Sequence, residues 1–396
     1  MNNKDEVVEK LKFLRDSLGL GDLRVAMLSS FYPSREKPYG GFFHTLARIY
    51  KEFFTLRVFV PDEGKTEYEY DGVLVQRDYP YYIYKEALSF KPDILLVCPA
   101  YPSSFLDFVS LLKRRLRTPR ITFPIGIADA FYTPFYYYQL YGKLPKYAIV
   151  MEFVRMLHLR RYIKESDEEG DYIVHPSEWQ KTACERSVFY KARNVRLIPF
   201  PVDTRIFRFQ PRSGRVERLI CVRPHTVRKY AIDLVIKASR GKYRTDIYGE
   251  GPLLLKHRAL ARRLKANVKF FPQFFTTHRD FAEACYRYDM GLMFTRADTQ
   301  GVTACEMQAT GLPVITSFVW AVPEFATGGT ILLKNHEVGK TEKIIDEIND
   351  KGILEELSWK ANKGIVEKCG IEKVMKEQFL LFNELLNRKK ASAPPS

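Results

Sequence analysis

The segment from Asp298 to Thr316 constrains the fold of this chain more than any other. Gly301 follows Asp298 closely, a helix-forming run extends from it to Gly311-Leu-Pro313, and Val314-Ile-Thr then has the character of a buried strand. A glycine permits the sharp turn from a strand into a helix, and the later glycine and proline end that helix. The segment therefore predicts a strand, helix and strand of an α/β fold, with free helix amides after Gly301 that suit an anion.

Glu306 adds a second acid, one helical turn beyond those amides. A carboxylate at that place can accept hydrogen bonds from two ribose hydroxyls, while Val302, Cys305 and Ala309 share one face of the helix. An ordinary unit of a doubly wound fold carries the same features, so the segment alone leaves that alternative open.

The whole segment resembles the donor-site signature of the family 4 retaining glycosyltransferases, which belong to group 1 of the glycosyl transferases and have the GT-B fold. That signature is a Glu, seven residues, a second Glu and then Ala-x-Gly-x-Pro-Val-Ile; here Asp298 stands at the first acid and Glu306 at the second. The resemblance implies that Asp298 faces the sugar, that Glu306 holds the ribose, and that the amides of Gly301, Val302 and Thr303 bind the diphosphate. Because Asp is one methylene shorter than Glu, we expect a changed sugar preference or rate.

Length and composition set outer limits on the protein. Its 396 residues, 46% of them hydrophobic, suffice for two domains with sizeable cores. The sequence has no apolar run long enough for a membrane span and a charged start unlike a signal peptide, which predicts a protein that works inside the cell. Its six cysteines are scattered without paired spacing, so we expect reduced core residues and neither zinc nor disulfides.

The formal charge of +16 admits three kinds of partner. They are nucleic acid, an anionic membrane surface, and small polyanions such as nucleotide diphosphates. Charge alone does not choose among them.

The first half of the chain has the rhythm of a parallel, doubly wound sheet. The predicted strands are Arg24–Ser29, Leu56–Val60, Val73–Gln76, Asp93–Val97 and Arg120–Phe123. Gly40 and Gly41 precede a helix that carries His44, and such glycines let a diphosphate approach the backbone. The resembling family has a Gly-Gly loop here that faces the cleft, although a simple loop explains the residues equally well.

The first half departs from the family pattern at a histidine position. After the strand at Arg120–Phe123 the family usually has a His-Gly pair, whose histidine is thought to touch the transferred sugar; here Gly126 is present and the histidine is missing. None of His44, His158 or His175 can be assigned its role from sequence.

An aromatic stretch, 129–147, is followed by a basic one, 155–164. Its tyrosines suit stacking on acceptor sugars, and the combination also suits a membrane interface or nucleic-acid bases. A helix pair packed on its own domain is a further explanation, and all three stay open. We expect Asp167–Asp171 to form a solvated acidic turn.

The second half begins with a strand and then a basic loop with Arg223, Arg228 and Lys229. Cations at the carboxyl end of a first strand suit a diphosphate whose charge grows as the glycosidic bond breaks. Arg223 and Lys229 resemble the phosphate-binding pair of the family. The segment around Gln273 resembles the part that borders the nucleobase.

We therefore predict an α/β protein of the GT-B type, with two Rossmann-like doubly wound domains facing a central cleft. Residues 1–204 form the acceptor-side domain, 205–370 the donor domain and 371–388 a helix crossing back to the first domain, with a disordered tail at 389–396. The expected catalytic residues are Asp298, Arg223 and Lys229. The expected donor-binding residues are Gly40, Gly41, Gly301, Val302, Thr303, Glu306, Arg228 and Gln273.

The predicted function is a metal-independent, retaining transfer of a sugar from a UDP- or GDP-sugar to a glycan, lipid or protein acceptor, without a cofactor. An anionic membrane surface at the inner face of a membrane is a candidate partner, and nucleic acid is not expected. The alternatives are a catalytically altered relative that binds nucleic acid or a membrane, and a sugar-nucleotide epimerase or phosphorylase.

Overall fold

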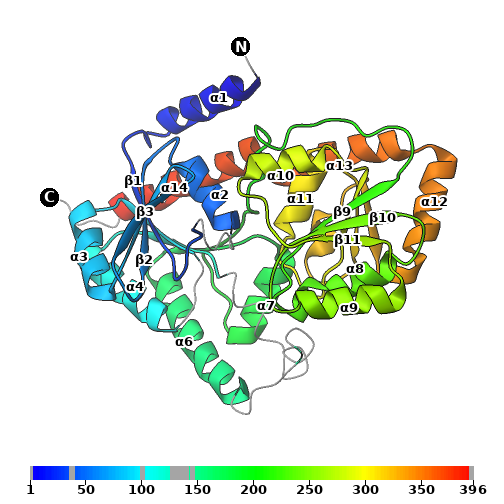
Figure 1. The fold of residues 1–396 in the computed structure, drawn as a ribbon. Helices are drawn as coiled ribbons and strands as arrows, with labels where there is room; N and C mark the ends of the chain where they lie inside the picture. Colours follow the sequence, from blue (N-terminus) through cyan, green and yellow to red (C-terminus); the bar gives the residue numbers. More distant parts are fainter. Residues whose placement is uncertain (1–2, 35–40, 99–102, 125–141, 143–147, 392–396) are drawn as a thin grey trace. The chain divides into compact units, whose positions relative to one another are not determined.

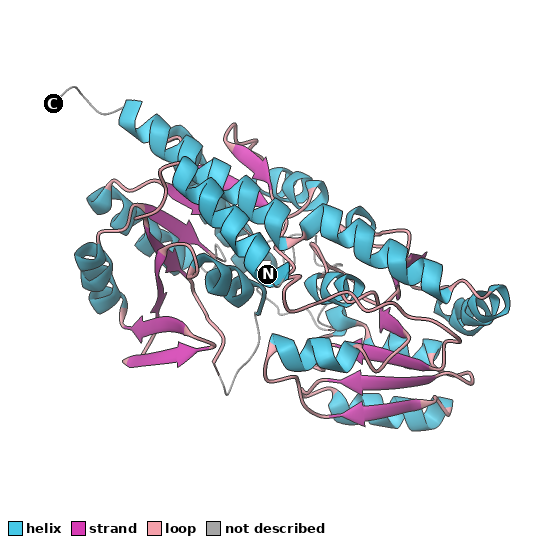
Figure 2. Ribbon diagram, turned by 90° about the horizontal axis from the view of Figure 1, so that it is seen from above, coloured by secondary structure: helices cyan, strands magenta, loops and turns pink. Residues whose placement is uncertain are grey.

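The computed structural model describes residues 3–34, 41–98, 103–124, 142 and 148–391 (Figure 1). The chain divides into two compact units. The first consists of residues 1–132, 146–201 and 372–396, and the second of residues 133–145 and 202–371. Each unit contains one sheet with helices packed on it (Figure 2), which confirms the predicted α/β class with two parallel-sheet domains.

The first unit holds an eight-stranded sheet in the order β3-β4-β2-β1-β5-β6-β7-β8. Its neighbouring strands run parallel except for β3 and β4, which form an antiparallel hairpin. The strands are β1 (Arg24–Leu28), β2 (Thr55–Pro61), β3 (Thr66–Tyr70), β4 (Val73–Asp78), β5 (Ile94–Val97), β6 (Arg120–Thr122), β7 (Tyr172–His175) and β8 (Val195–Leu197). Every residue of β5 is buried, because helices cover both faces of a central parallel strand.

The helices of the first unit include one from the far end of the chain. They are α1 (Asn3–Ser17), α2 (Gly41–Tyr50), α3 (Pro80–Phe90), α4 (Ser103–Leu116), α6 (Ala148–Glu168), α7 (Glu178–Val188) and α14 (Ile371–Ala391). The hydroxyl of Tyr50 donates to Gln378 at 2.9 Å, and the ring of Phe379 lies 5.3 Å from those of both Phe53 and Phe54. α14 thus completes the core of the first unit.

α14 also corrects the predicted tail. It continues through Lys389 and Lys390 to Ala391, so the disorder predicted from residue 389 onward is wrong for these residues. Basic side chains in the last turn interact favourably with the helix dipole, which extends the helix. Residues 392–396 lie outside the described part of the chain.

The expectation of a solvated turn at Asp167–Asp171 is wrong, because both end residues are buried. Asp171 accepts hydrogen bonds from Lys113 at 2.8 Å and from Arg120 at 2.7 Å. Asp167 accepts from the backbone N–H groups at 193 and 194, at 2.8 and 2.9 Å. These partners are distant in the sequence, so local patterning gave no sign of them.

The second unit holds a six-stranded, wholly parallel sheet in the order β11-β10-β9-β12-β13-β14. Its strands are β9 (Arg218–Val222), β10 (Arg244–Tyr248), β11 (Val268–Phe271), β12 (Met290–Met293), β13 (Val314–Ser317) and β14 (Thr330–Leu333). In chain order this is 3-2-1-4-5-6, the Rossmann arrangement, and the strand order reverses between β9 and β12. Ligands of such sheets bind beyond the carboxyl ends of the strands at that reversal.

The helices of the second unit flank this sheet. They are η2 (Arg228–Tyr230), α8 (Ile232–Ala238), α9 (Leu254–Leu264), α10 (His278–Cys285), α11 (Val302–Ala309), η3 (Val322–Phe325), η4 (Val338–Lys340), α12 (Thr341–Lys351) and α13 (Leu354–Cys369). The chain enters this unit after Pro201, slightly before the predicted boundary at residue 204. Val202 donates to Cys369 at 2.8 Å and accepts from Ile371 at 3.0 Å, so the segments by which the chain enters and leaves the unit lie side by side.

Candidate functional site

The strand-order reversal of the second sheet brings together a buried cation and an acid. Arg223 follows β9 directly, and Asp298 lies in the loop after β12. Nη1 of Arg223 donates to Oδ2 of Asp298 at 3.2 Å, and Arg223 is only 7% exposed. Two of the predicted site residues therefore meet where a doubly wound sheet binds its ligand.

Asp298 also shapes the start of α11. Its Oδ1 accepts hydrogen bonds from the amides of Gly301 at 2.8 Å and Gln300 at 3.4 Å. Gly301 has φ 77°, a left-handed conformation that confirms the predicted glycine turn. The amide of Ala304 already donates to the carbonyl of Gly301, so among the described residues the preceding two amides, at 302 and 303, have no backbone acceptor. Such amides suit an anion.

Glu306 lies in the second turn of α11 and is only 5% exposed. Its Oε1 is 3.7 Å from Nε2 of His278, the first residue of α10. The ring of His278 packs edge-on against Phe207, with centroids 6.0 Å apart. Sequence reasoning identified the acid and missed the histidine, because no spacing relates residues on separate helices.

The basic loop after β9 is held through its backbone. The carbonyl of Lys229 accepts from the amide of Arg296 at 2.9 Å, and that of Arg228 accepts from Nη1 of Arg296 at 2.7 Å. Arg296 is itself paired with Asp233 at 2.7 Å. Arg296 thus fixes the two predicted phosphate ligands, a role that its sequence context did not reveal.

Gly249 and Gly251 allow a second loop to approach the first. Their φ values are 147° and 142°; a Cβ at Gly249 would overlap the carbonyl oxygen of Arg223, and one at Gly251 would lie 2.6 Å from the carbonyl carbon of His225. The amide of His225 donates to the carbonyl of Glu250 at 2.8 Å. Only glycine fits at these positions while Arg223 keeps its place.

His225 is buried and pairs with the half-buried His257. Its Nδ1 lies 2.8 Å from Nδ1 of His257, so one ring nitrogen carries the proton and the other accepts it. Burial, and then the nearby charges of His257 and Arg258, lower the pKa of His225 to about 4. His225 is therefore neutral at physiological pH, and burial also lowers the pKa of His257.

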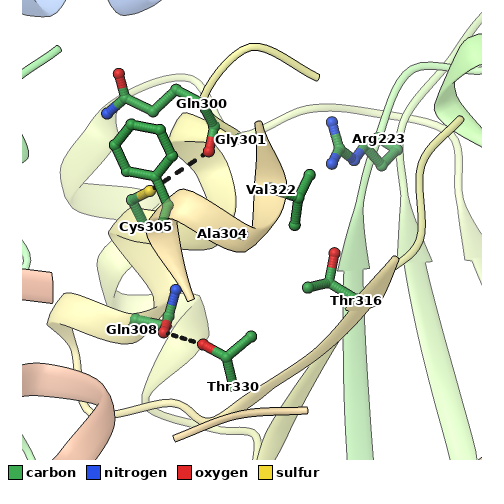
Figure 3. A pocket seen from close by; sticks show the side chains of 10 residues that line it. Arg223, Gln300, Gly301, Ala304, Cys305, Gln308, Thr316, Val322 and Thr330 are labelled. Atoms are coloured by element: carbon green, nitrogen blue, oxygen red, sulfur yellow. Dashed lines mark hydrogen bonds between the residues drawn. The ribbon is translucent and has the colours of Figure 1, made fainter. Parts of the chain in front are cut away.

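A small pocket lies beside the start of α11 (Figure 3). Gln308 is part of its lining, and Oε1 of Gln308 accepts from the hydroxyl of Thr330 at 2.6 Å. Its lining residues are Arg223, Gln300, Gly301, Ala304, Cys305, Gln308, Thr316, Val322, Phe325 and Thr330. Among the described residues that line it, Arg223 is the only cation.

The other predicted residues are more dispersed. Gln273 follows β11, which is an edge strand of the sheet. The backbone N–H of Gln273 donates to the carbonyl of Phe271 at 2.8 Å. Gly41 is the first residue of α2 in the first unit, whereas Gly40 and Gly126 lie outside the described residues.

The histidines of the first unit make internal contacts. His44 is buried, with Nδ1 3.0 Å from the hydroxyl of Tyr32 and Nε2 3.3 Å from Asp71. His175 is buried beside Gln180 at 3.1 Å, and burial lowers its pKa to about 4.

Within the described ranges, no cluster of three or more His, Cys, Asp or Glu side chains is arranged to bind a metal ion. In the same part of the chain, no helix combines the length and apolar character needed to cross a membrane.

Comparison with known proteins agrees with this geometry. Residues 225–350, most of the second unit, match the family model described as glycosyl transferases group 1. No curated protein matches the chain.

Solved structures match nearly the whole chain. A sucrose-phosphate synthase from Thermosynechococcus elongatus has a TM-score of 0.70 at 12% identity, over 92% of this chain and 100% of that one. HepE from Anabaena in complex with UDP has a TM-score of 0.67 at 12% identity, over 94% and 100%. A glycosyltransferase from Rickettsia africae has a TM-score of 0.66 at 11% identity, over 92% of this chain and 99% of that one. At such identities the likeness establishes the GT-B fold.

Proposed function

We propose that this chain, whose residues 225–350 match the glycosyl transferases group 1 model and whose fold is that of GT-B proteins, moves a sugar from a nucleoside diphosphate donor to an acceptor, with retention at the anomeric carbon. The observation that carries the proposal is the meeting of Arg223, Asp298 and the free end of α11 at the strand-order reversal. Retention rests on the resemblance of the segment from Asp298 to Glu306 to the family 4 signature.

The proposed donor site uses charge and free amides together. Arg223, Lys229 and the amides at 302 and 303 bind the diphosphate, and Glu306 accepts hydrogen bonds from the ribose hydroxyls. As the bond between the anomeric carbon and the phosphate oxygen breaks, negative charge grows on the leaving diphosphate. Fixed cations and amides stabilise that charge more than the charge of the intact donor, which lowers the barrier.

The reaction needs no group beyond donor and acceptor in this proposal. The acceptor oxygen forms the new bond on the face that the diphosphate leaves, and the departing phosphate oxygen takes the acceptor's proton. No metal or cofactor is required, so chelation by EDTA is expected to leave turnover unchanged.

Asp298 has two successive partners in this scheme. In the free protein its carboxylate balances the buried charge of Arg223 at 3.2 Å. A bound diphosphate supplies negative charge to Arg223, and Asp298 then becomes available to a sugar hydroxyl. The acceptor is a glycan, lipid or protein, and the proposed place of action is inside the cell.

A thermal-shift screen of UDP- and GDP-sugars tests the donor assignment, because a ligand that binds only the folded state raises the melting temperature. Transfer of the best donor's sugar is then measured in the Lys229→Ala and Glu306→Gln variants. We expect both to lose transfer. Lys237→Ala, which removes an exposed cation from the neighbouring helix α8, is the matched control.

Full turnover in Lys229→Ala would remove the donor-site assignment. Inversion in the product, read from its anomeric NMR coupling, would remove retention alone. Release or isomerisation of the sugar without an acceptor would instead identify a phosphorylase or an epimerase.

A further inference from the structure

Helix α6 of the first unit, labelled in the lower part of Figure 1, carries four exposed apolar side chains. Val150, Phe153, Val154 and Leu157 are 61%, 55%, 44% and 47% exposed. Their spacing places all of them on one side of the helix within two turns. Single exposed apolar residues are ordinary, but four on one helix face mark an interaction surface.

The opposite face of α6 is already used by the fold. Leu159, Tyr162 and Ile163 are buried in the core cluster that also contains residues of β5 and α4. The exposed apolar strip is therefore separate from the face of α6 that packs in the core. α6 is anchored on one side and presents a second apolar surface on the other.

The same outward side becomes basic in the next two turns. Arg160, Arg161 and Lys164 are exposed there, and the acid that follows them on that side is Glu168, 3.6 Å from Lys164. One helix face thus carries an apolar half and then a cationic half. This combination is typical of helices that lie in the interface of an anionic bilayer, with apolar side chains among the acyl chains and cations at the headgroups.

We infer that the outward face of α6 docks the protein on an anionic lipid membrane. The helix lies along the surface, since its other face remains packed in the first unit. Aliphatic side chains such as Val150 and Leu157 suit acyl chains and offer no ring for stacking on sugars or bases. A second copy of the chain would present the same cations, so charge complementarity favours an anionic bilayer over self-association.

This inference is independent of the proposed reaction, and its test needs no turnover. The full-length protein is sedimented with vesicles of phosphatidylcholine alone and of equal parts phosphatidylcholine and phosphatidylglycerol. We expect binding to the anionic vesicles only, weakening as salt is raised. Phe153→Ser combined with Leu157→Ser, and separately Arg160→Gln with Arg161→Gln, should each weaken binding about tenfold or more.

Helix α9 of the second unit offers a matched control. Leu255 is 76% exposed, and Arg262 and Arg263 are also exposed, so Leu255→Ser with Arg262→Gln and Arg263→Gln removes similar groups elsewhere. We expect this variant to bind vesicles like the unchanged protein. Because all altered side chains are exposed, every variant should keep its melting temperature.

A single-site probe reports whether α6 itself enters the bilayer. All six cysteines are buried, so Leu157→Cys provides one accessible thiol for an environment-sensitive dye, and Leu255→Cys provides the control thiol. The dye at 157 should shift to the blue with anionic vesicles, and the dye at 255 should not. Equal vesicle binding by the α6 and α9 variants would overturn the proposal. It would also be overturned if the protein failed to bind vesicles and instead formed a dimer that the α6 substitutions dissociate.

Discussion

Replacing Asp298 by asparagine separates the two roles of its carboxylate. The amide keeps an oxygen that can accept from Gly301, but it removes the charge that faces Arg223 at 3.2 Å. Nε of Arg223 is buried and has no hydrogen-bond partner among the described residues. The substitution therefore leaves a cation that is 7% exposed without a compensating charge.

The separation of the two charges sets the size of the effect. At 3.2 Å and an effective dielectric constant of about 20, their attraction is about 5 kcal/mol. Removing one partner of a fully buried pair costs about 3–5 kcal/mol of stability. Because the side chain of Asp298 is 17% exposed, we expect a loss of about 2 kcal/mol in the free protein.

A bound nucleoside diphosphate should restore the lost stability of the variant, because its phosphates place negative charge beside Arg223. The variant should therefore bind nucleoside diphosphate more tightly than the unchanged protein, by about 30-fold for 2 kcal/mol, while transferring sugar more slowly. Calorimetric titration measures the affinity, and denaturant unfolding measures the stability.

Asp246→Asn is the control for the stability loss. It removes the buried partner of Arg244, at 2.8 Å on β10, and should lower stability without tightening nucleotide binding. Equal or weaker nucleotide binding by Asp298→Asn would refute the idea that Arg223 is shared between the carboxylate and the diphosphate.

Three further perturbations follow from the packing and titration of buried groups. Gly249→Ala should lower the free energy of unfolding by about 3 kcal/mol or more, and the melting temperature with it, because φ at this position is 147° and the new Cβ would overlap the carbonyl oxygen of Arg223. Gly339→Ala is the control, since a Cβ there meets open space and should change stability little. The free energy of unfolding should fall by about 1.4 kcal/mol per pH unit as the pH drops from about 6.5 towards 4, because His225 binds a proton in the unfolded chain but not in the folded state. In the His225→Asn variant, the free energy of unfolding should depend less steeply on pH over this range. Asp171→Ala should lower the free energy of unfolding by about 3 kcal/mol, because it removes the buried acid nearest to Lys113 and Arg120 and leaves Glu169 to face both cations. Glu178→Gln, at a more exposed ion pair, should lower it by less than about 1 kcal/mol. Denaturant unfolding measures both changes.

The predicted strands of the first half, the glycine turn at Gly301 and the buried strand Val314–Ser317 are all present. Each leaves a local sign in the sequence: an apolar run of strand length, or a glycine where φ is positive. The hairpin of β3 and β4 was missed, although Asp71-Gly72 between two short strands is a hairpin signal. Its strand β3 is largely exposed and polar, so hydrophobic patterning does not reveal it.

The site was predictable where its residues follow the ends of parallel strands, as Arg223 and Asp298 do. The contact between them follows from strand order, since β9 and β12 are neighbours only because the sheet reverses there. Supporting residues such as His278 and Arg296 were not predictable. Their roles depend on side-chain packing between elements, which a single sequence does not record.

The placement of α14 in the first unit has a consequence for synthesis on the ribosome. Tyr50, Phe53 and Phe54 precede the second unit in the chain, yet they find their partners Gln378 and Phe379 only after the segment that forms the second sheet has been translated. The continuous segment that forms the second sheet can fold before its predecessor does. The first unit thus matures after the second, and a nascent chain halted before residue 371 would display an unfinished apolar surface to chaperones.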